Sequence, residues 1–131
     1  MKKFKSSFKV YYEDTDAGGV VYYANYLKFI ERARTEAIAS LDFSNSNLKK
    51  NHGIFIIVKS WNLNFIKPSR LEDNLDIFSE ITDVKNVSIK MKQDIFINDN
   101  LIFTADIHLA TINIDGKLTK MPEKLKEKLT K

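Results

Sequence analysis

The apolar residues of this 131-residue chain change their spacing once, from a helical period to a strand period. Between about Ala24 and Leu41 they recur every three or four positions and form one face, made of Tyr26, Phe29, Ile30, Ala33, Ala37 and Leu41. From Ile54 onward, most apolar residues alternate with polar ones, which is typical of half-buried strands. One long helix followed by several strands predicts an α+β domain, in which the helix covers one face of an antiparallel sheet.

Five segments have the pattern of strands, and they lie near 4–12, 54–65, 75–81, 87–97 and 101–109. Turn signals at Asn98–Asn100 and at Asp115–Gly116 favour tight connections, which join antiparallel neighbours. Pro68 ends the second strand, and a short helix is expected over Pro122–Lys131 with the proline near its first position. A turn of helix is also expected near Leu48. No linker or repeat interrupts residues 1–131, so we expect a single domain.

The composition excludes several classes of function. The chain has no Cys, so disulfides, thiolate metal sites and cysteine nucleophiles are absent. The net charge of +4 comes from widely spread basic residues, a pattern that argues against nucleic-acid binding. This excess fits a phosphate-bearing small molecule or simple solubility. No long apolar run or signal peptide is evident, so we expect no membrane span and a cytoplasmic location.

A glycine-containing loop, Glu13–Gly19, separates the first strand from the helix and carries a carboxylate at Asp16. A helix start offers unpaired N–H groups and the positive end of the helix dipole. Such donors can stabilise an oxyanion while a carboxylate attacks an acyl carbon or activates water. From spacing alone, a helix cap or a turn former explains Asp16 as well. We interpret Asp14 as structural.

Two motifs resemble a known family. The first is Tyr12-Glu13-Asp14-Thr15-Asp16, followed by Gly19-Val20-Val21-Tyr22, Ala24-Asn25-Tyr26 and Glu31-Arg32-Ala33-Arg34-Thr35-Glu36. It resembles the Tol–Pal-associated acyl-CoA thioesterases of the YbgC family, in the 4-hydroxybenzoyl-CoA thioesterase group. The segment Phe65–Asp73 is similar to that family's Pro-Ala-Arg-Leu-Asp-Asp stretch. This resemblance covers nearly the whole chain. It implies the hotdog fold, with a long central helix against a curved antiparallel sheet of about five strands. It also implies a homodimer with the active site between subunits, which pairs into a homotetramer.

The resemblance further implies an acyl-CoA thioesterase that hydrolyses short-chain or aromatic acyl-CoA, with Asp16 as nucleophile or general base. Backbone N–H groups at the helix start would form the oxyanion hole, with Tyr23 the first candidate and Val21 or Tyr22 behind it. Tyr12 either hydrogen-bonds in the site or packs as a strand residue. Many relatives carry His where this chain has Tyr23, so this chain keeps a backbone donor there and lacks an imidazole.

The residues expected to bind substrate form two groups. Loop residues that approach the substrate are Gly19, Val20, Val21 and Tyr22. Cations for the phosphates of coenzyme A are Lys59, Lys67, Arg70 and Lys85, although ordinary surface charge explains each one singly. Coenzyme A enters as part of the substrate, and we expect neither a cofactor nor a metal.

Two other functions also fit the sequence. A hydratase-type hotdog enzyme would need a His paired with an acid, and the only histidines, His52 and His108, lie outside the loop and the long helix. A non-catalytic module of lipid metabolism that binds acyl-CoA or acyl carrier protein stays open, because a basic surface can dock an acidic carrier.

Overall fold

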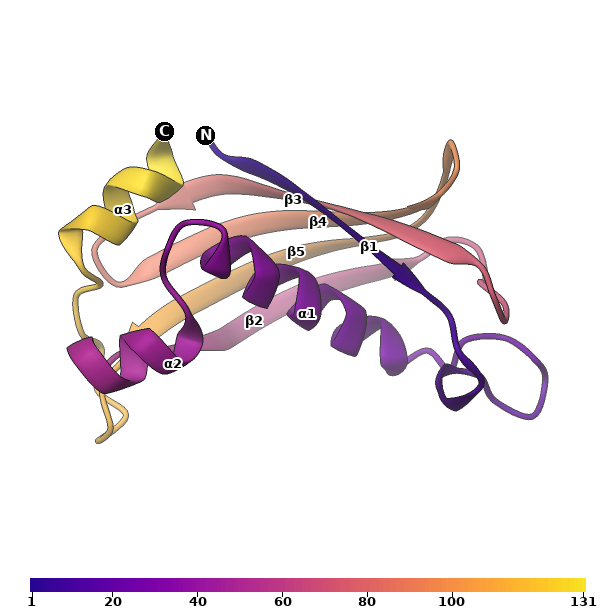
Figure 1. Ribbon diagram of the computed structural model, residues 1–131, viewed down its shortest axis with the longest axis horizontal. Coiled ribbons are helices and arrows are strands. Elements are labelled where there is room, and N and C mark those ends of the chain that lie inside the picture. The colour runs from indigo at the N-terminus through magenta and orange to yellow at the C-terminus, as the bar shows by residue number, and fades with distance from the viewer.

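The computed structural model describes all 131 residues and shows an antiparallel sheet that curves around one long helix (Figure 1). The sheet order is β1-β3-β4-β5-β2. The strands are β1 (Lys3–Lys9), β2 (Phe55–Phe65), β3 (Asn74–Val84), β4 (Ser88–Ile97) and β5 (Asn100–Ile112). Every neighbouring pair is antiparallel. Helix α1 (Asn25–Ala39) lies in the curve of the sheet, so the predicted α+β hotdog arrangement is confirmed.

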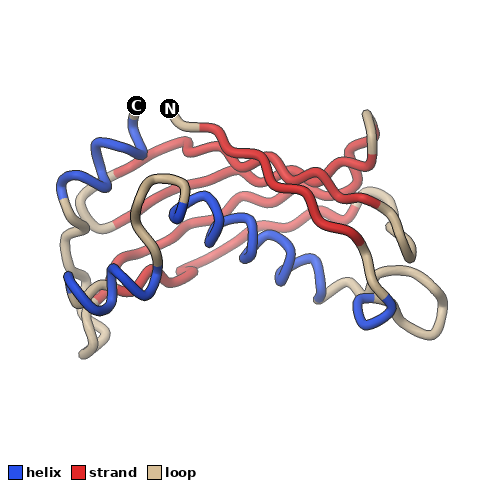
Figure 2. The backbone as a smooth tube through the Cα atoms, viewed as in Figure 1, coloured by secondary structure: helices blue, strands red, loops and turns tan.

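Shorter helical elements gather at the two ends of the sheet (Figure 2). They are the 3₁₀ turn η1 (Tyr12–Asp14), α2 (Asn45–Asn47), the π-helical turn η2 (Leu48–His52) and α3 (Glu123–Thr130). The turn η1 lies at one end, beside the loop that leads into α1, and α2, η2 and α3 lie at the other end. None of the helices combines the length and the apolar character needed to cross a bilayer.

The hydrophobic core lies between α1 and the sheet. The helix buries one face, made of Tyr26, Phe29, Ile30, Ala33, Ala37 and Ile38. Alternate residues of β3 and β4 point at this face, including Ile77 and Ile95, which pair across the two strands. The small side chains of Ala33 and Ala37 let the helix backbone lie close to the strands. In α3, Leu125 and Leu129 are fully buried and close the core at the end opposite the α1 start.

A polar row crosses this core beneath the middle of α1. Gln93 of β4 is fully buried, and its Nε2 donates to the carbonyl of Ile30 at 3.0 Å and to Ser79 Oγ at 2.9 Å. Its Oε1 accepts a hydrogen bond from Nη1 of Arg34 at 3.0 Å. Gln93 stands between Met91 and Ile95, at a position where the strand pattern calls for an apolar residue.

Several element bounds differ from the sequence prediction. Strand β1 ends at Lys9 rather than near Tyr12, because the Tyr11 N–H donates to the Asp14 carboxylate at 2.9 Å and the chain turns into η1. Helix α1 ends at Ala39, and Leu41 is buried in the following turn. The predicted C-terminal helix is confirmed, with Pro122 as its N-cap residue.

A matched pair of substitutions tests where the core lies. Phe29→Ala is expected to lower the free energy of unfolding by about 4 kcal/mol, because it opens a cavity under α1. Phe78→Ala, on the exposed face of β3, is expected to cost about 1 kcal/mol or less. Urea titration at one protein concentration measures both values. Equal losses for the two variants would show that the α1–sheet contact is not the main core.

Candidate active site

The loop between β1 and α1 is held closed by its own backbone. The N–H of Asp16 donates to the carbonyl of Val20 at 2.9 Å, and the N–H of Gly19 donates to the carbonyl of Asp16 at 3.0 Å. Thr15 and Val21 form an isolated antiparallel bridge at its base. Gly19 has φ of 80°, in the left-handed region that glycine adopts without strain. The loop is therefore a tight, ordered turn.

The Asp16 carboxylate is oriented by a local hydrogen bond. Its Oδ1 accepts the N–H of Gly18 at 2.8 Å, and no protein group donates to Oδ2. The side chain is exposed at the surface of the chain. A Cβ at position 18 would lie 3.2 Å from Oδ1, so glycine there leaves room for the carboxylate. One carboxylate oxygen is thus anchored while the other can meet a reactant.

Asp14 ties the loop to the helix. Its carboxylate is buried and accepts the N–H of Tyr11 at 2.9 Å. Its carbonyl accepts both the N–H of Tyr22, at 3.0 Å, and the side-chain amide of Asn25, at 2.9 Å. The N-cap of α1 is Ala24, which has no capping side chain. These contacts give Asp14 a part in holding the loop.

The start of α1 presents two free backbone donors, the N–H groups of Tyr23 and Ala24. The next three N–H groups, of Asn25, Tyr26 and Leu27, donate to carbonyls three residues earlier. The N–H of Val21 donates to Ser69 at 2.8 Å, and that of Tyr22 donates to Asp14. Of the three oxyanion donors considered from sequence, only Tyr23 therefore has a free N–H.

The two sequence motifs meet beside this helix start. Val20 forms an isolated bridge with Arg70, and the Ser69 carbonyl accepts the Val21 N–H. Ser69 is fully buried, and its Oγ lies 2.8 Å from the hydroxyl of Tyr26. The Ser69 N–H also donates to that hydroxyl at 3.2 Å. The Pro68–Asp73 segment thus holds the loop against the first turn of α1.

An open cleft of about 280 Å³ lies beside the start of α1, and Tyr23 is among its lining residues. It is lined by Val21, Tyr23, Tyr26, Phe65, Ile66, Lys67 and Pro68. The Phe65 ring lies 6.2 Å from that of Tyr23 and 5.8 Å from that of Tyr26. Hydrogen bonding and charge interaction with Tyr23 raise the pKa of the neighbouring Tyr22 phenol. The cleft is an aromatic surface with one cation, Lys67, on its wall.

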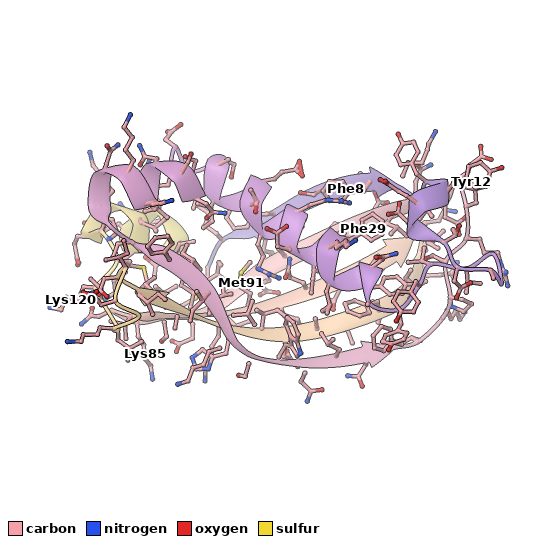
Figure 3. All side chains as sticks on the ribbon, turned by 90° about the horizontal axis from the view of Figure 1, so that it is seen from below. Phe8, Tyr12, Phe29, Lys85, Met91 and Lys120 are labelled. Carbon is pink, nitrogen blue, oxygen red and sulfur yellow. The ribbon has the colours of Figure 1, made fainter.

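The structure brings together only some of the predicted residues. The loop residues Gly19 to Tyr23 share one end of the molecule with Asp16, Lys67 and Arg70. Tyr12 belongs to η1 at this end and is 81% exposed. Lys59 lies in the middle of β2, and Lys85 lies in the β3–β4 turn at the opposite end of the sheet from Tyr12 (Figure 3).

Three functional candidates escaped the sequence analysis. Ala24 offers a donor through its backbone, which no side-chain pattern reports. Ser69 stands in the Phe65–Asp73 motif, and its burial and its contact with Tyr26 depend on tertiary packing that no local pattern reports. Gln93 breaks the alternation of β4, and that break was a readable signal.

The two histidines lie apart from the Asp16 loop. His52 is exposed at the end of η2, and His108 is partly exposed on β5, where it pairs with Lys90 and Ser60. No group of three or more His, Cys, Asp or Glu is arranged to hold a metal ion.

Removing the hydroxyl of Tyr26 tests its contact with Ser69, which joins the Pro68–Asp73 segment to the first turn of α1. Tyr26→Phe leaves the buried Ser69 without its side-chain partner, so we expect the free energy of unfolding to fall by about 1–3 kcal/mol. Tyr12→Phe, whose hydroxyl makes no protein hydrogen bond, is expected to leave stability unchanged. Urea denaturation measures both. Equal stability of the two variants would show that the Tyr26–Ser69 contact contributes nothing.

Known proteins are similar to this chain in sequence and in fold. The sequence model of the thioesterase-like superfamily matches residues 10–129. The chain is 36% identical over 115 residues to the acyl-CoA thioesterase YbgC of Haemophilus influenzae, covering 88% of this chain and 84% of that protein. It is 41% identical over 99 residues to the acyl-CoA thioester hydrolase YbgC of Escherichia coli O6:H1, covering 76% of this chain and 73% of that protein.

A solved structure agrees with this assignment. The probable thioesterase from Bartonella henselae is 31% identical and superposes with a TM-score of 0.89, covering 92% of this chain and all of that one. Sequence and fold therefore lead to the same group of enzymes. The chain belongs to the thioesterase-like superfamily and, within it, to the YbgC family of acyl-CoA thioesterases.

Proposed function

We propose that this protein hydrolyses short-chain or aromatic acyl-CoA thioesters at the start of α1, with Asp16 as the catalytic carboxylate. One observation carries the proposal. The free N–H groups of Tyr23 and Ala24 lie just before α1. They follow closely on the turn that orients the Asp16 side chain. A mainly apolar cleft, which Tyr23 helps to line, could take the acyl group.

The chemistry of a thioester matches this limited set of groups. A thiolate is a good leaving group, since its conjugate thiol has a pKa of about 8.5, so no strong acid is needed to expel it. What the reaction needs is a nucleophile and stabilisation of the developing oxyanion. The free oxygen of Asp16 either attacks the carbonyl carbon and forms a mixed anhydride, or takes a proton from an attacking water.

Backbone donors supply the oxyanion stabilisation in this proposal. The carbonyl oxygen of the substrate accepts hydrogen bonds from Tyr23 and Ala24 while negative charge develops on it. One such donor is typically worth roughly 3 kcal/mol in the transition state, and the positive end of the α1 dipole adds to it. A backbone N–H works with any side chain, so Tyr23 can stand where relatives carry His.

The site gains a second side if two chains pair through β2. This strand is at the edge of the sheet, so one row of its backbone groups is unpaired. It also exposes Ile57, Trp61 and Phe65, which are 41%, 48% and 51% exposed. A long apolar edge strand is prone to pair with another strand. We propose antiparallel pairing with β2 of a second copy, in a homodimer that can assemble further into a tetramer.

Such pairing would turn one copy end for end relative to the other. The end that carries Lys85 in one chain would then lie at the same end of the dimer as the partner's Asp16 loop. Lys67 and Arg70 of one chain and Lys85 of the other would then be placed to bind the phosphates of coenzyme A. Tyr12, exposed beside the loop, would offer its hydroxyl to the substrate.

Asp16→Asn tests the catalytic assignment. The amide keeps an oxygen for the Gly18 N–H but cannot act as base or nucleophile, so kcat should fall by about a hundredfold or more while the melting temperature stays unchanged. Released thiol, measured on a panel of acyl-CoA substrates, gives the rate.

Asp115→Asn, in the exposed turn after β5, is the matched control and should keep the wild-type rate. If Asp16→Asn retains wild-type turnover on every acyl-CoA, Asp16 does not perform the chemistry.

Trp61→Lys tests the edge pairing. A charge at the centre of β2 is expected to convert the wild-type oligomer to monomer in light scattering and to remove most thioesterase activity, because each site loses its second side. Phe78→Lys places the same charge on β3 and should leave assembly intact. A Trp61→Lys protein that stays oligomeric and active would rule out this interface.

A further inference from the structure

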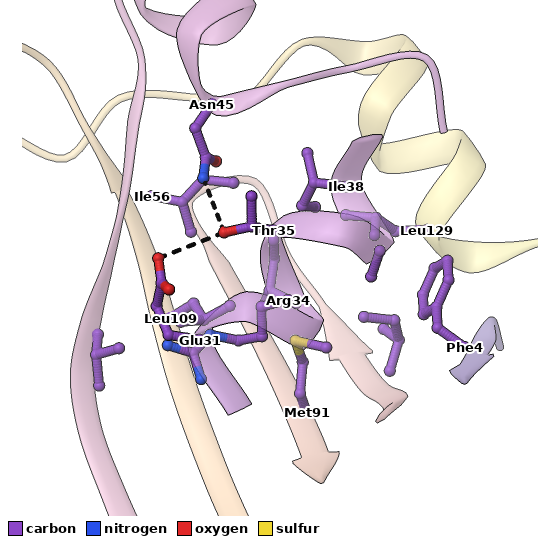
Figure 4. A pocket seen from close by; sticks show the side chains of 14 residues that line it. Phe4, Glu31, Arg34, Thr35, Ile38, Asn45, Ile56, Met91, Leu109 and Leu129 are labelled. Carbon is purple, nitrogen blue, oxygen red and sulfur yellow. Dashed lines mark hydrogen bonds between the residues drawn. The ribbon is translucent and has the colours of Figure 1, made fainter. Parts of the chain in front are cut away.

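A second cavity, of about 70 Å³, lies between the C-terminal half of α1 and the sheet. Figure 4 shows its walls, which come mainly from apolar side chains of α1, β2 and the central strands. Ile56 and Val58 contribute from β2, and Leu109 contributes from β5. The polar residues of the lining are Glu31, Arg34, Thr35 and Asn45.

Arg34 is a cation without an acidic partner in this cavity. Its Nη1 donates to Gln93, and no carboxylate lies within ion-pair distance of the guanidinium. Burial lowers the pKa of Arg34, and the charge of Glu31 partly opposes this effect. A guanidinium has five N–H donors and stays protonated in proteins. A charge in apolar surroundings is costly unless it is paired, so this site favours an acceptor from outside the chain.

Glu31 is the only carboxylate in the lining of this cavity, and it makes a hydrogen bond with Thr35. The Thr35 hydroxyl donates to Glu31 Oε1 at 3.4 Å, and the Asn45 amide donates to the Thr35 oxygen at 3.4 Å (Figure 4). Glu31 is exposed on the solvent side of the cavity. The remaining donors of Arg34 are thus free for a ligand.

This cavity is remote from the Tyr23 cleft of its own chain. Arg34 lies ten positions after Ala24, the N-cap of α1, which is about 15 Å at 1.5 Å per residue. A short acyl group held at Tyr23 cannot span that distance. The two cavities share no lining residue.

Edge pairing through β2 would bring this cavity to the other chain's site. Ile56 and Val58, at the start of β2, line the Arg34 cavity, whereas Phe65, at the end of β2, packs beside Tyr23. Antiparallel pairing sets the start of one strand against the end of the other. The Arg34 cavity of one chain would then face the free N–H of the partner's Tyr23.

We propose that Arg34 is a specificity-determining residue that selects acyl groups ending in a carboxylate over aliphatic acyl groups of equal length. This inference rests on the proposed function and names its substrate class. Arg and carboxylate form two parallel hydrogen bonds, which fix both the position and the orientation of the ligand. The cavity is small, so it could take the terminal carboxylate of an acyl group but not the whole acyl-CoA.

Glutaryl-CoA and pentanoyl-CoA are the matched probes, since their acyl chains have the same number of carbons. For the wild-type dimer, kcat/KM is expected to be higher for glutaryl-CoA by about tenfold or more, which is the size of one charge-assisted hydrogen bond. Arg34→Met should reduce this ratio to one or below while pentanoyl-CoA is still hydrolysed. Arg34→Lys keeps the charge and loses the paired donors, so its ratio should lie between the two.

Arg32→Met is the control, because Arg32 is exposed on the same helix and does not line the cavity. It should keep the wild-type ratio. A wild-type enzyme that hydrolyses both substrates equally, or prefers pentanoyl-CoA, overturns the inference and leaves the proposed function standing.

Equal losses on both substrates in Arg34→Met would assign Arg34 a structural role instead. If Arg34→Met does not fold, the wild-type and Arg34→Lys ratios decide. A folded wild-type protein that hydrolyses no acyl-CoA at all overturns the proposed function itself.

Discussion

The packing of α1 into the curve of the sheet is the interaction on which the rest of the structure depends. Tyr26, in the first turn, stacks on Phe103 of β5 with ring centroids 5.2 Å apart and carries the hydroxyl that meets Ser69. This contact fixes where the helix starts. Backbone hydrogen bonds from Tyr22 to Asp14 and from Val21 to Ser69 tie the chain on either side of the Asp16 loop to this helix start. The free N–H groups of Tyr23 and Ala24 therefore have a well-packed support. Backbone donors on rigid supports need no reorganisation when charge develops.

Strand β2 gives this fold two unequal ends. One end carries Phe65, which walls the cleft beside Tyr23, and the other carries Ile56 and Val58, which wall the Arg34 cavity. Both cavities therefore have walls from β2, the strand at one edge of the sheet. If two chains paired about a two-fold axis through the middle of β2, the Arg34 cavity of each chain would meet the Tyr23 cleft of the other. In the assembly that we propose, one edge strand would therefore serve both subunit pairing and substrate recognition.

Much of the fold follows from the sequence because its signals are local. The helical period over Ala24–Leu41, the alternation in β4 and the turn at Asn98–Asn100 each depend only on neighbouring residues. The meeting of Val21 with Ser69, which are 48 positions apart, depends on tertiary packing, and no local pattern reports it. The choice among Val21, Tyr22 and Tyr23 as donors likewise needs the hydrogen-bond partners of each N–H. Gln93 could have been found, since it interrupts the apolar face of its strand.

The Arg34–Gln93 pair is difficult to explain by stability alone. Replacing buried ionic groups with well-packed apolar residues is often neutral or stabilising, whereas removing one partner leaves the other unsatisfied. Arg34 makes no ion pair, and the side chains around it include the apolar Met91, Leu109 and Ile89. A role in ligand selection explains the arrangement, because an acceptor brought by the substrate pairs with the charge that the core leaves free. In this proposal the unpaired charge lowers the stability of the free protein, and binding of an acyl group with a carboxylate would pair it.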